Sequence, residues 1–159
     1  MPVLNALVRA CRPGGFELAE ALWRSGAFEE RLLAAKLIGA IARQDPARAL
    51  GFISAVSKDL ADWAVCDTLG TQGIRPIAHA QRDAIFALSE RLTRSRHVWE
   101  RRLGIVLLLN FAAIPTERAT IRRMLKPLRS DKEPYVRKAL TWIDRRREST
   151  ETTSGHGSI

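Results

Sequence analysis

The stretch WERRLGIVLLL, at residues 99–109, places a run of apolar residues directly after two arginines and lacks the alternation of a strand. It begins at Trp99, and equivalent helix starts stand at Phe28, Trp63 and Pro134, at intervals of 35, 36 and 35 residues. Helices that recur at this period are typical of stacked helix pairs, because each pair buries its apolar face only against its neighbours. The sequence therefore predicts an all-α protein, an α-solenoid (superhelix) of HEAT-like repeats with one extended concave face.

Helical periodicity continues outward from this stretch in both directions, and Pro and Gly residues separate the segments. Asp45 and Pro46 are a helix cap followed by proline at the first helical position. The expected helices cover residues 16–24, 28–43, 46–58, 61–69, 79–93, 98–111, 116–128 and 134–147. We expect a single domain over 1–148 and a disordered Ser/Thr/Gly-rich tail over 149–159.

Composition excludes several classes of protein. The longest apolar run, residues 103–109, is too short to span a bilayer. The N-terminus carries Arg9 and Arg12 and does not resemble a secretory signal, so a cytoplasmic protein is expected. Cys11 and Cys66 lie far apart without a zinc-binding or disulfide pattern. No phosphate-binding loop or nucleophile elbow occurs either, so we expect neither a metal nor a cofactor.

The positive charge is concentrated in the second half of the chain. Residues 75–147 hold 18 Lys and Arg against 7 Asp and Glu, whereas residues 1–74 hold 8 of each kind. Most of these cations are arginines, whose planar fork suits bidentate phosphate contacts. The second half of the chain is therefore a candidate polyanion-binding surface. The alternative is an ordinary basic face exposed to solvent.

Asp67 is the first candidate functional residue, because two sibling repeats place Leu32 and Leu103 at its position. A carboxylate beside packed apolar surface costs several kcal/mol of stability unless it is paired. Such a residue is therefore expected either to have a partner or to serve a function. Trp63 lies four residues before it, and Trp142 and Arg145 lie three residues apart, so each pair shares one helix face.

If the solenoid curves as expected, Arg102 and four other residues converge on the concave face. These are Trp63, Asp67, Trp142 and Arg145. Indole faces beside a carboxylate could hold a cationic group, and the arginines could hold phosphates. The alternatives are structural. The tryptophans could fill the core, Asp67 could cap a helix or form an ion pair with Arg102, and Arg31, Arg102 and Arg137 could form a ladder of salt bridges.

At these residues the sequence resembles the DNA alkylation repair glycosylases built from HEAT-like repeats, the AlkD-like family. The strings that carry the resemblance are AEALWRSGAFEERLLAAKLI at 19–38, DWAVCD at 62–67, WERRLGIVLLL at 99–109 and YVRKALTWIDR at 135–145. The resemblance implies that Asp67, Trp63 and Trp142 line a catalytic cleft on a concave DNA-binding face. It implies DNA-backbone contacts for Arg102 and Arg145, beside which we expect Arg101, Arg137 and Lys138 to bind DNA.

By this resemblance the protein is a DNA N-glycosylase that excises cationic alkylated purines, such as 3-methyladenine and 7-methylguanine, from double-stranded DNA. Asp67 would stabilise the oxocarbenium-like sugar and position the attacking water. Members of the family usually continue further at both ends, so we expect a shorter grip on DNA. Two other hypotheses remain open from the residues: a noncatalytic module that binds a nucleic-acid backbone, and a scaffold whose concave face takes an acidic protein.

Overall fold

The computed structural model describes the backbone of residues 2–154 and the side chains of residues 2–149. Its α-helices are α1 Pro2–Cys11, α2 Gly15–Arg24, α3 Phe28–Ile41, α4 Pro46–Val56, α5 Trp63–Thr71, α6 Arg82–Thr93, α7 Val98–Leu108, α8 Arg118–Leu125 and α9 Pro134–Ser154. Within this part of the chain there is no strand. The prediction of an all-α protein is confirmed.

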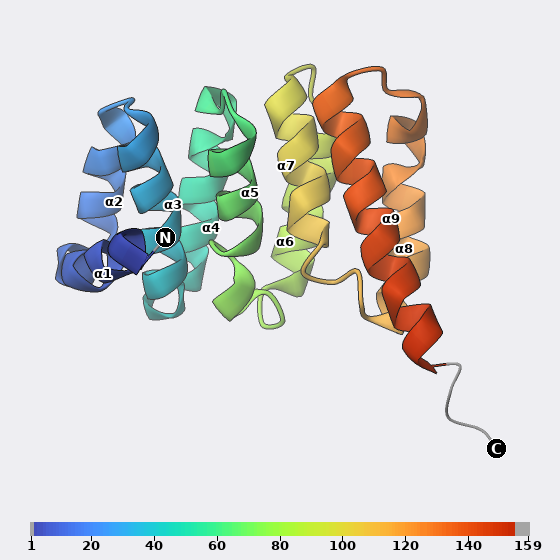
Figure 1. Cartoon of the computed structure of the whole chain (residues 1–159), viewed down its shortest axis with the longest axis horizontal. Helices are drawn as coiled ribbons and strands as arrows, with labels where there is room; N and C mark the ends of the chain where they lie inside the picture. Colours follow the sequence, from blue (N-terminus) through green and yellow to red (C-terminus); the bar gives the residue numbers. More distant parts are fainter. Residues whose placement is uncertain (1, 155–159) are drawn as a thin grey trace.

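The helices form two parallel rows (Figure 1). Helices α3, α5, α7 and α9 stand side by side in the front row, and each contacts the next. Helices α2, α4, α6 and α8 stand behind them, with α2 packed on α3 and α6 on α7. This is the stack of antiparallel pairs expected of an α-solenoid. We call the surface formed by α3, α5, α7 and α9 the front face.

The repeat positions identified in the sequence mark the starts of the front-row helices. Phe28 and Trp63 are the first residues of α3 and α5, Trp99 is the second residue of α7, and Pro134 opens α9. Corresponding residues of successive repeats therefore lie at the same height on the front face. None of the described helices has the length and apolar content needed to cross a membrane.

Side-chain caps fix where two of the helices begin. The Asp45 carboxylate accepts a hydrogen bond from the Arg48 backbone N–H at 3.0 Å, and Pro46 follows it as predicted. At α5 the Asp62 carboxylate accepts from the Val65 N–H at 2.9 Å. The second cap sets the phase of α5, and with it the direction in which Trp63 and Asp67 point.

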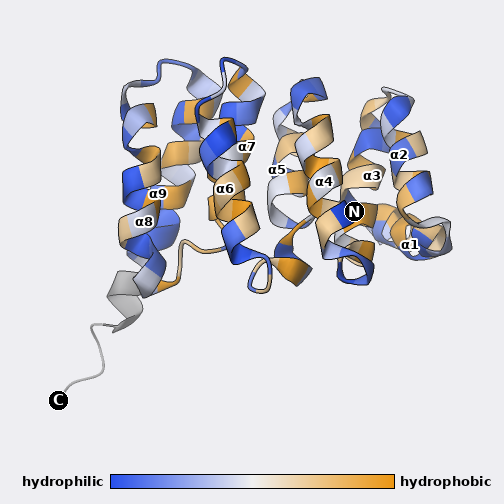
Figure 2. Ribbon diagram, turned by 180° about the vertical axis from the view of Figure 1, so that it is seen from behind, coloured by the Kyte–Doolittle hydropathy of each residue, from blue (hydrophilic) through white to orange (hydrophobic). Residues whose placement is uncertain are grey.

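The core lies between the two rows and is built from aliphatic side chains. Figure 2 shows hydrophilic and hydrophobic stretches alternating along the helices of the rear row. Ile38, Ile53, Leu69, Ile85 and Leu107 have no exposed surface. Each such side chain contributes roughly 1.5–3 kcal/mol when it leaves water, so the rows cohere by apolar burial.

Neighbouring front helices approach so closely at Gly39 that a side chain has no room there. A Cβ atom on Gly39 of α3 would lie 2.3 Å from the Gln72 carbonyl oxygen at the end of α5. The obstacle is backbone, which cannot rotate away. Gly39 therefore sets the spacing between α3 and α5.

Replacing Gly39 by valine is expected to lower the free energy of unfolding by about 3 kcal/mol or more, because α3 and α5 must separate. Urea unfolding followed by circular dichroism measures the loss. Gly51→Val is the matched control, since a Cβ at Gly51 of α4 meets open space. Equal losses in the two variants would show that helix propensity, and not the contact with α5, is responsible.

The helix boundaries differ from prediction mainly at the two ends of the chain. Helix α1 was not predicted, and it lies across the end of the α2–α3 pair (Figure 1). Helix α9 runs to Ser154 although a disordered tail was expected from residue 149. No proline or glycine interrupts the chain between Pro134 and Gly155, and the Ser149 hydroxyl donates to the Arg145 carbonyl at 2.8 Å. Residues 155–159 lie outside the described part, where the expected disorder stays a prediction.

Candidate functional site

The centre of the site is an ion pair between Asp67 of α5 and Arg102 of α7. The Arg102 Nε donates to Asp67 Oδ1 at 2.9 Å, and Nη2 donates to Asp67 Oδ2 at 2.9 Å. The third group, Nη1, donates to the Tyr135 carbonyl of α9 at 2.6 Å. Arg102 thus ties together three successive front helices. The structural alternative of an Asp67–Arg102 ion pair is therefore present in the protein.

Burial differs between the two partners, and this difference indicates a division of roles. The Arg102 side chain is 7% exposed, whereas the Asp67 side chain is 17% exposed. All three nitrogens of the Arg102 guanidinium donate hydrogen bonds within the protein, whereas each Asp67 oxygen keeps a lone pair that Arg102 does not use. Arg102 therefore fixes the carboxylate in place, and the outward side of Asp67 stays accessible on the front face.

Trp63 lies one helical turn before Asp67 and is 57% exposed. As the first residue of α5 it does not fill the core, so the core-filling alternative does not hold for this tryptophan. One turn beyond Asp67, the Thr71 hydroxyl donates to the Asp67 backbone carbonyl at 2.7 Å. Trp63, Asp67 and Thr71 therefore form one stripe along α5, since residues four apart share a helix face.

Helix α9 carries a second stripe with a different character. Arg137, Lys138, Thr141, Trp142 and Arg145 surround a hollow of about 430 Å³. Trp142 is half-buried and packs against the core, while Arg137, Lys138 and Arg145 are exposed. The Arg137 and Arg145 side chains have no ion-pair partner among the side chains that the structure describes. These predicted DNA-binding residues are therefore accessible cations beside an indole.

A second hollow joins the α5 stripe to the α9 stripe. Its volume is about 350 Å³, and Thr71, Arg75, Asn110, Trp142 and Arg146 are among the residues that surround it. Trp142 borders both hollows, and Thr71 is the continuation of the Asp67 stripe. The predicted residues Asp67 and Trp142 are thus linked along the front face, although they share no hollow.

Arg101 points away from these stripes. Its Nε donates to the Asp131 carboxylate at 2.8 Å, and its Nη1 donates to the carbonyls of Ser95 and Arg96. The geometry favours a structural role for Arg101 and a positioning role for Arg102. Direct phosphate contacts by these two arginines stay predictions.

The other structural alternatives have mixed outcomes. Trp23 is 3% exposed and lies in the core, as expected. Trp99 is half-buried, with its ring centroid 4.6 Å from that of Tyr135. Of the arginines at the shared repeat position, Arg31 donates to carbonyl oxygens, and Arg137 has no ion-pair partner among the described side chains. They therefore do not form a salt-bridge ladder.

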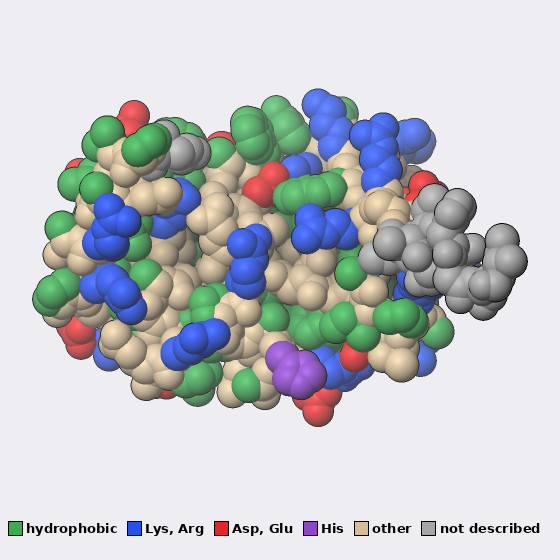
Figure 3. Space-filling view, turned by 60° about the horizontal axis from the view of Figure 1, so that its bottom comes forward, with side chains coloured by type: hydrophobic (Ala, Val, Ile, Leu, Met, Phe, Trp, Pro, Cys, Tyr) green, Lys and Arg blue, Asp and Glu red, His purple; other side chains and the backbone are tan. Residues whose placement is uncertain are grey.

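The surface around the stripes is basic. Figure 3, in which the bottom of the molecule in Figure 1 is turned forward, shows Lys and Arg side chains spread across this side, with fewer acidic side chains, most of them near the outline. This distribution agrees with the charge imbalance in the sequence and favours a polyanionic ligand.

Nucleophilic and metal chemistry find no support among the described side chains. Burial raises the pKa of the Cys66 thiol well above its ordinary value, and the adjacent Asp67 raises that pKa further. Cys66 is therefore a neutral core residue and not a thiolate nucleophile. No group of three His, Cys, Asp or Glu residues within the described chain is arranged to hold a metal ion.

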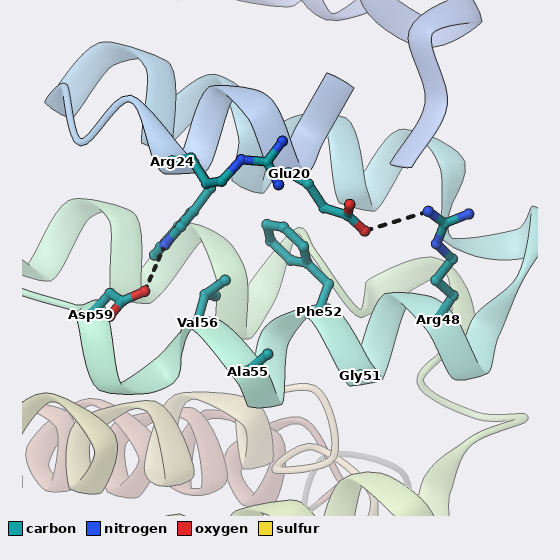
Figure 4. A pocket seen from close by; sticks show the side chains of 9 residues that line it. Glu20, Arg24, Arg48, Gly51, Phe52, Ala55, Val56 and Asp59 are labelled. Atoms are coloured by element: carbon teal, nitrogen blue, oxygen red, sulfur yellow. Dashed lines mark hydrogen bonds and ion pairs between the residues drawn. The ribbon is translucent and has the colours of Figure 1, made fainter. Parts of the chain in front are cut away.

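A further hollow of about 450 Å³ opens between the rear helices α2 and α4 (Figure 4). Phe52, Val56 and Ala55 line it, and the Trp23 indole N–H donates to the Asp59 carboxylate at 3.3 Å at its edge. Across its other side, Glu20 pairs with Arg48 at 3.4 Å. Its two glutamate and aspartate side chains are already engaged, Glu20 by Arg48 and Asp59 by Trp23, and Asp67 is not among its lining residues, so we do not assign it as the functional site.

Sequence reasoning missed Arg75, Asn110 and Arg146. They lie in or just after the ends of front helices, and no short motif distinguishes them from other polar residues. A signal was nevertheless available, because Arg75 and Arg146 lie two repeats apart at the same repeat position.

Comparison with known proteins identifies the family of this chain. The sequence matches the family described as DNA alkylation repair enzyme over residues 1–146, which include both stripes and the ion pair. No curated protein and no solved structure gives a significant match. On the strength of the family match, which covers nearly the whole chain, this protein belongs to the DNA alkylation repair enzyme family.

Proposed function

We propose that the protein is a DNA N-glycosylase that hydrolyses the glycosidic bond of cationic alkylated purines, 3-methyladenine and 7-methylguanine, in double-stranded DNA. Membership of a DNA alkylation repair family supports the substrate class. The observation that carries the proposal is the Asp67 carboxylate, held by two hydrogen bonds from Arg102 and 17% exposed on a basic face. Arg102 holds Asp67 from inside the protein, so the outward side of the carboxylate is left to meet a positive charge on the front face.

The reaction provides that positive charge. An alkylated purine is cationic, and its leaving nitrogen takes the electrons of the broken C1′–N bond, so the base departs neutral. Positive charge then develops on the sugar, and Asp67 stabilises it electrostatically. Water adds to C1′ and loses one proton, which yields an abasic sugar, the neutral base and H⁺. A general acid is not needed for departure of the base.

The tryptophans and free cations serve binding. Trp63 offers an exposed ring on the stripe of Asp67, and Trp142 offers a half-buried ring beside Arg145. Aromatic faces pack against sugars and cationic bases, while Arg137, Lys138 and Arg145 suit backbone phosphates. The open front face is compatible with engaging the lesion without a deep pocket.

The experiment is incubation of the protein with a duplex that carries a single 7-methylguanine, followed by alkaline cleavage at abasic sites. A strand break at the lesion, absent with undamaged duplex, is the expected result. Salt-sensitive duplex binding without base release would instead identify a noncatalytic DNA-binding module. Absence of both would contradict the assignment of the front face to DNA and favour a protein partner.

A further inference from the structure

We propose that Arg75 and Arg146 form a second phosphate subsite, which holds one backbone phosphate of the bound DNA on the side of Trp142 opposite Arg145. This inference rests on the proposed function, because it names further binding residues on the same face. Both arginines border the 350 Å³ hollow between the ends of α5, α7 and α9. That hollow is separate from the one around Arg137, Lys138 and Arg145.

The two arginines approach the hollow from opposite sides. Arg75 follows the end of α5 and Arg146 lies on α9, with the end of α7 between them. They occupy the same position in alternate repeats, and the repeat between them places Phe111 there, which is buried. Of these three equivalent residues, only Arg75 and Arg146 line the hollow.

Neither guanidinium is paired with a carboxylate in the part of the chain whose side chains the structure describes. Both side chains are exposed, and no carboxylate forms an ion pair with either one among the described residues. Other arginines nearby behave differently, since Arg82 pairs with Glu117 and Arg129 pairs with Asp144. Two free cations that converge on one hollow repel each other, and an anion between them removes this repulsion.

The remaining groups make the hollow rigid. The Asn110 Nδ2 donates to the carbonyls of Gly70 at 2.8 Å and Leu107 at 3.0 Å, so this side chain closes the end of α7 against α5. The Thr71 hydroxyl donates to the Asp67 carbonyl. With these donors engaged, Arg75 and Arg146 are the groups left to bind an anion there, and their forks match a phosphate.

The place of the subsite explains what it would do. Trp142 borders the hollow of Arg145 and the hollow of Arg75 and Arg146. One strand running over this indole would therefore have a phosphate held on each side of it. Holding a nucleotide at both ends fixes its position along α5, where Asp67 is presented, and this would align the sugar with the carboxylate.

The salt dependence of binding to an undamaged duplex tests the subsite. The slope of log affinity against log salt falls by about 0.9 for each phosphate that the protein no longer neutralises. We expect Arg75→Ser and Arg146→Ser each to lower the affinity about tenfold with a fall in slope well below about 0.9, because the remaining arginine still neutralises the phosphate. The double variant is expected to lower the slope by about 0.9, because both arginines hold the same phosphate. A decrease of about 1.8 would overturn the shared subsite.

Arg122→Ser is the matched control, since Arg122 is an exposed arginine on rear helix α8 without an ion pair among the described residues. If its affinity falls as much as that of Arg75→Ser, net charge accounts for the effect and the subsite is overturned. Thermal melts identify any variant that fails to fold, and Arg75→Gln, which also removes the charge, then replaces Arg75→Ser. The slopes do not depend on base release, so a failure of the subsite and a failure of the proposed glycosylase are read separately.

Discussion

Replacing Asp67 by asparagine is expected to lower base release from a 7-methylguanine duplex by about 100- to 1,000-fold, the usual loss when one preorganised group that stabilises the transition state is removed. Affinity for the duplex is expected to stay the same or to rise, because a negative charge leaves a basic face. Single-turnover cleavage assays and anisotropy titrations measure the two quantities. Normal release by Asp67→Asn would contradict the mechanism.

The variant also disturbs the ion pair, so it needs a control that does the same elsewhere. An asparagine at position 67 would turn an N–H toward one of the two Arg102 donors, and some stability would be lost. Asp131→Asn makes an equivalent change, since Asp131 accepts from Arg101 at 2.8 Å and is 11% exposed. We expect Asp131→Asn to excise normally at a similar loss of stability, which separates chemistry from folding.

Much of the fold could be predicted because the sequence pattern that starts a helix recurs in each repeat. The starts of α3, α5, α7 and α9 follow the 35-residue period, and the Asp45 cap confirms the start of α4. Helix α1 was missed because its residues carry no repeat partner in the sequence. The end of α9 could not be predicted from composition, because Ser and Thr are common in disordered tails and yet do not break a helix as Pro and Gly do.

The site could be predicted only where a residue breaks the repeat. Asp67 stood out because its siblings are Leu32 and Leu103, and the structure shows why it is tolerated there. The bond from Arg102 to the Tyr135 carbonyl could not be predicted, since backbone acceptors leave no mark in a sequence. Distinguishing Arg101, which is engaged by Asp131, from the free Arg145 likewise needed side-chain geometry.

Replacing Arg102 by methionine is expected to lower the free energy of unfolding by about 3–5 kcal/mol, the cost of leaving one member of a buried ion pair without its partner. The Arg102 side chain is 7% exposed, so methionine fills similar volume without adding surface. The Asp67 carboxylate would then lack both of its Arg102 donors, and the Tyr135 carbonyl would lose the hydrogen bond that it accepts from Arg102 Nη1. Urea unfolding measures the loss, and base release is expected to fall with it because Asp67 is no longer held in place.

The double variant Asp67→Leu with Arg102→Met decides what the ion pair is for. Leucine is the residue that two sibling repeats use at position 67, so the apolar pair is expected to regain most of the stability lost by Arg102→Met alone. Base release is expected to remain absent. A stable, inactive protein would mean that packing alone can hold α5, α7 and α9 together, and that Asp67 and Arg102 are kept for the reaction. If the double variant is as unstable as Arg102→Met, the unpaired carboxylate is not the cause of the loss, and the ion pair is a structural element of the fold.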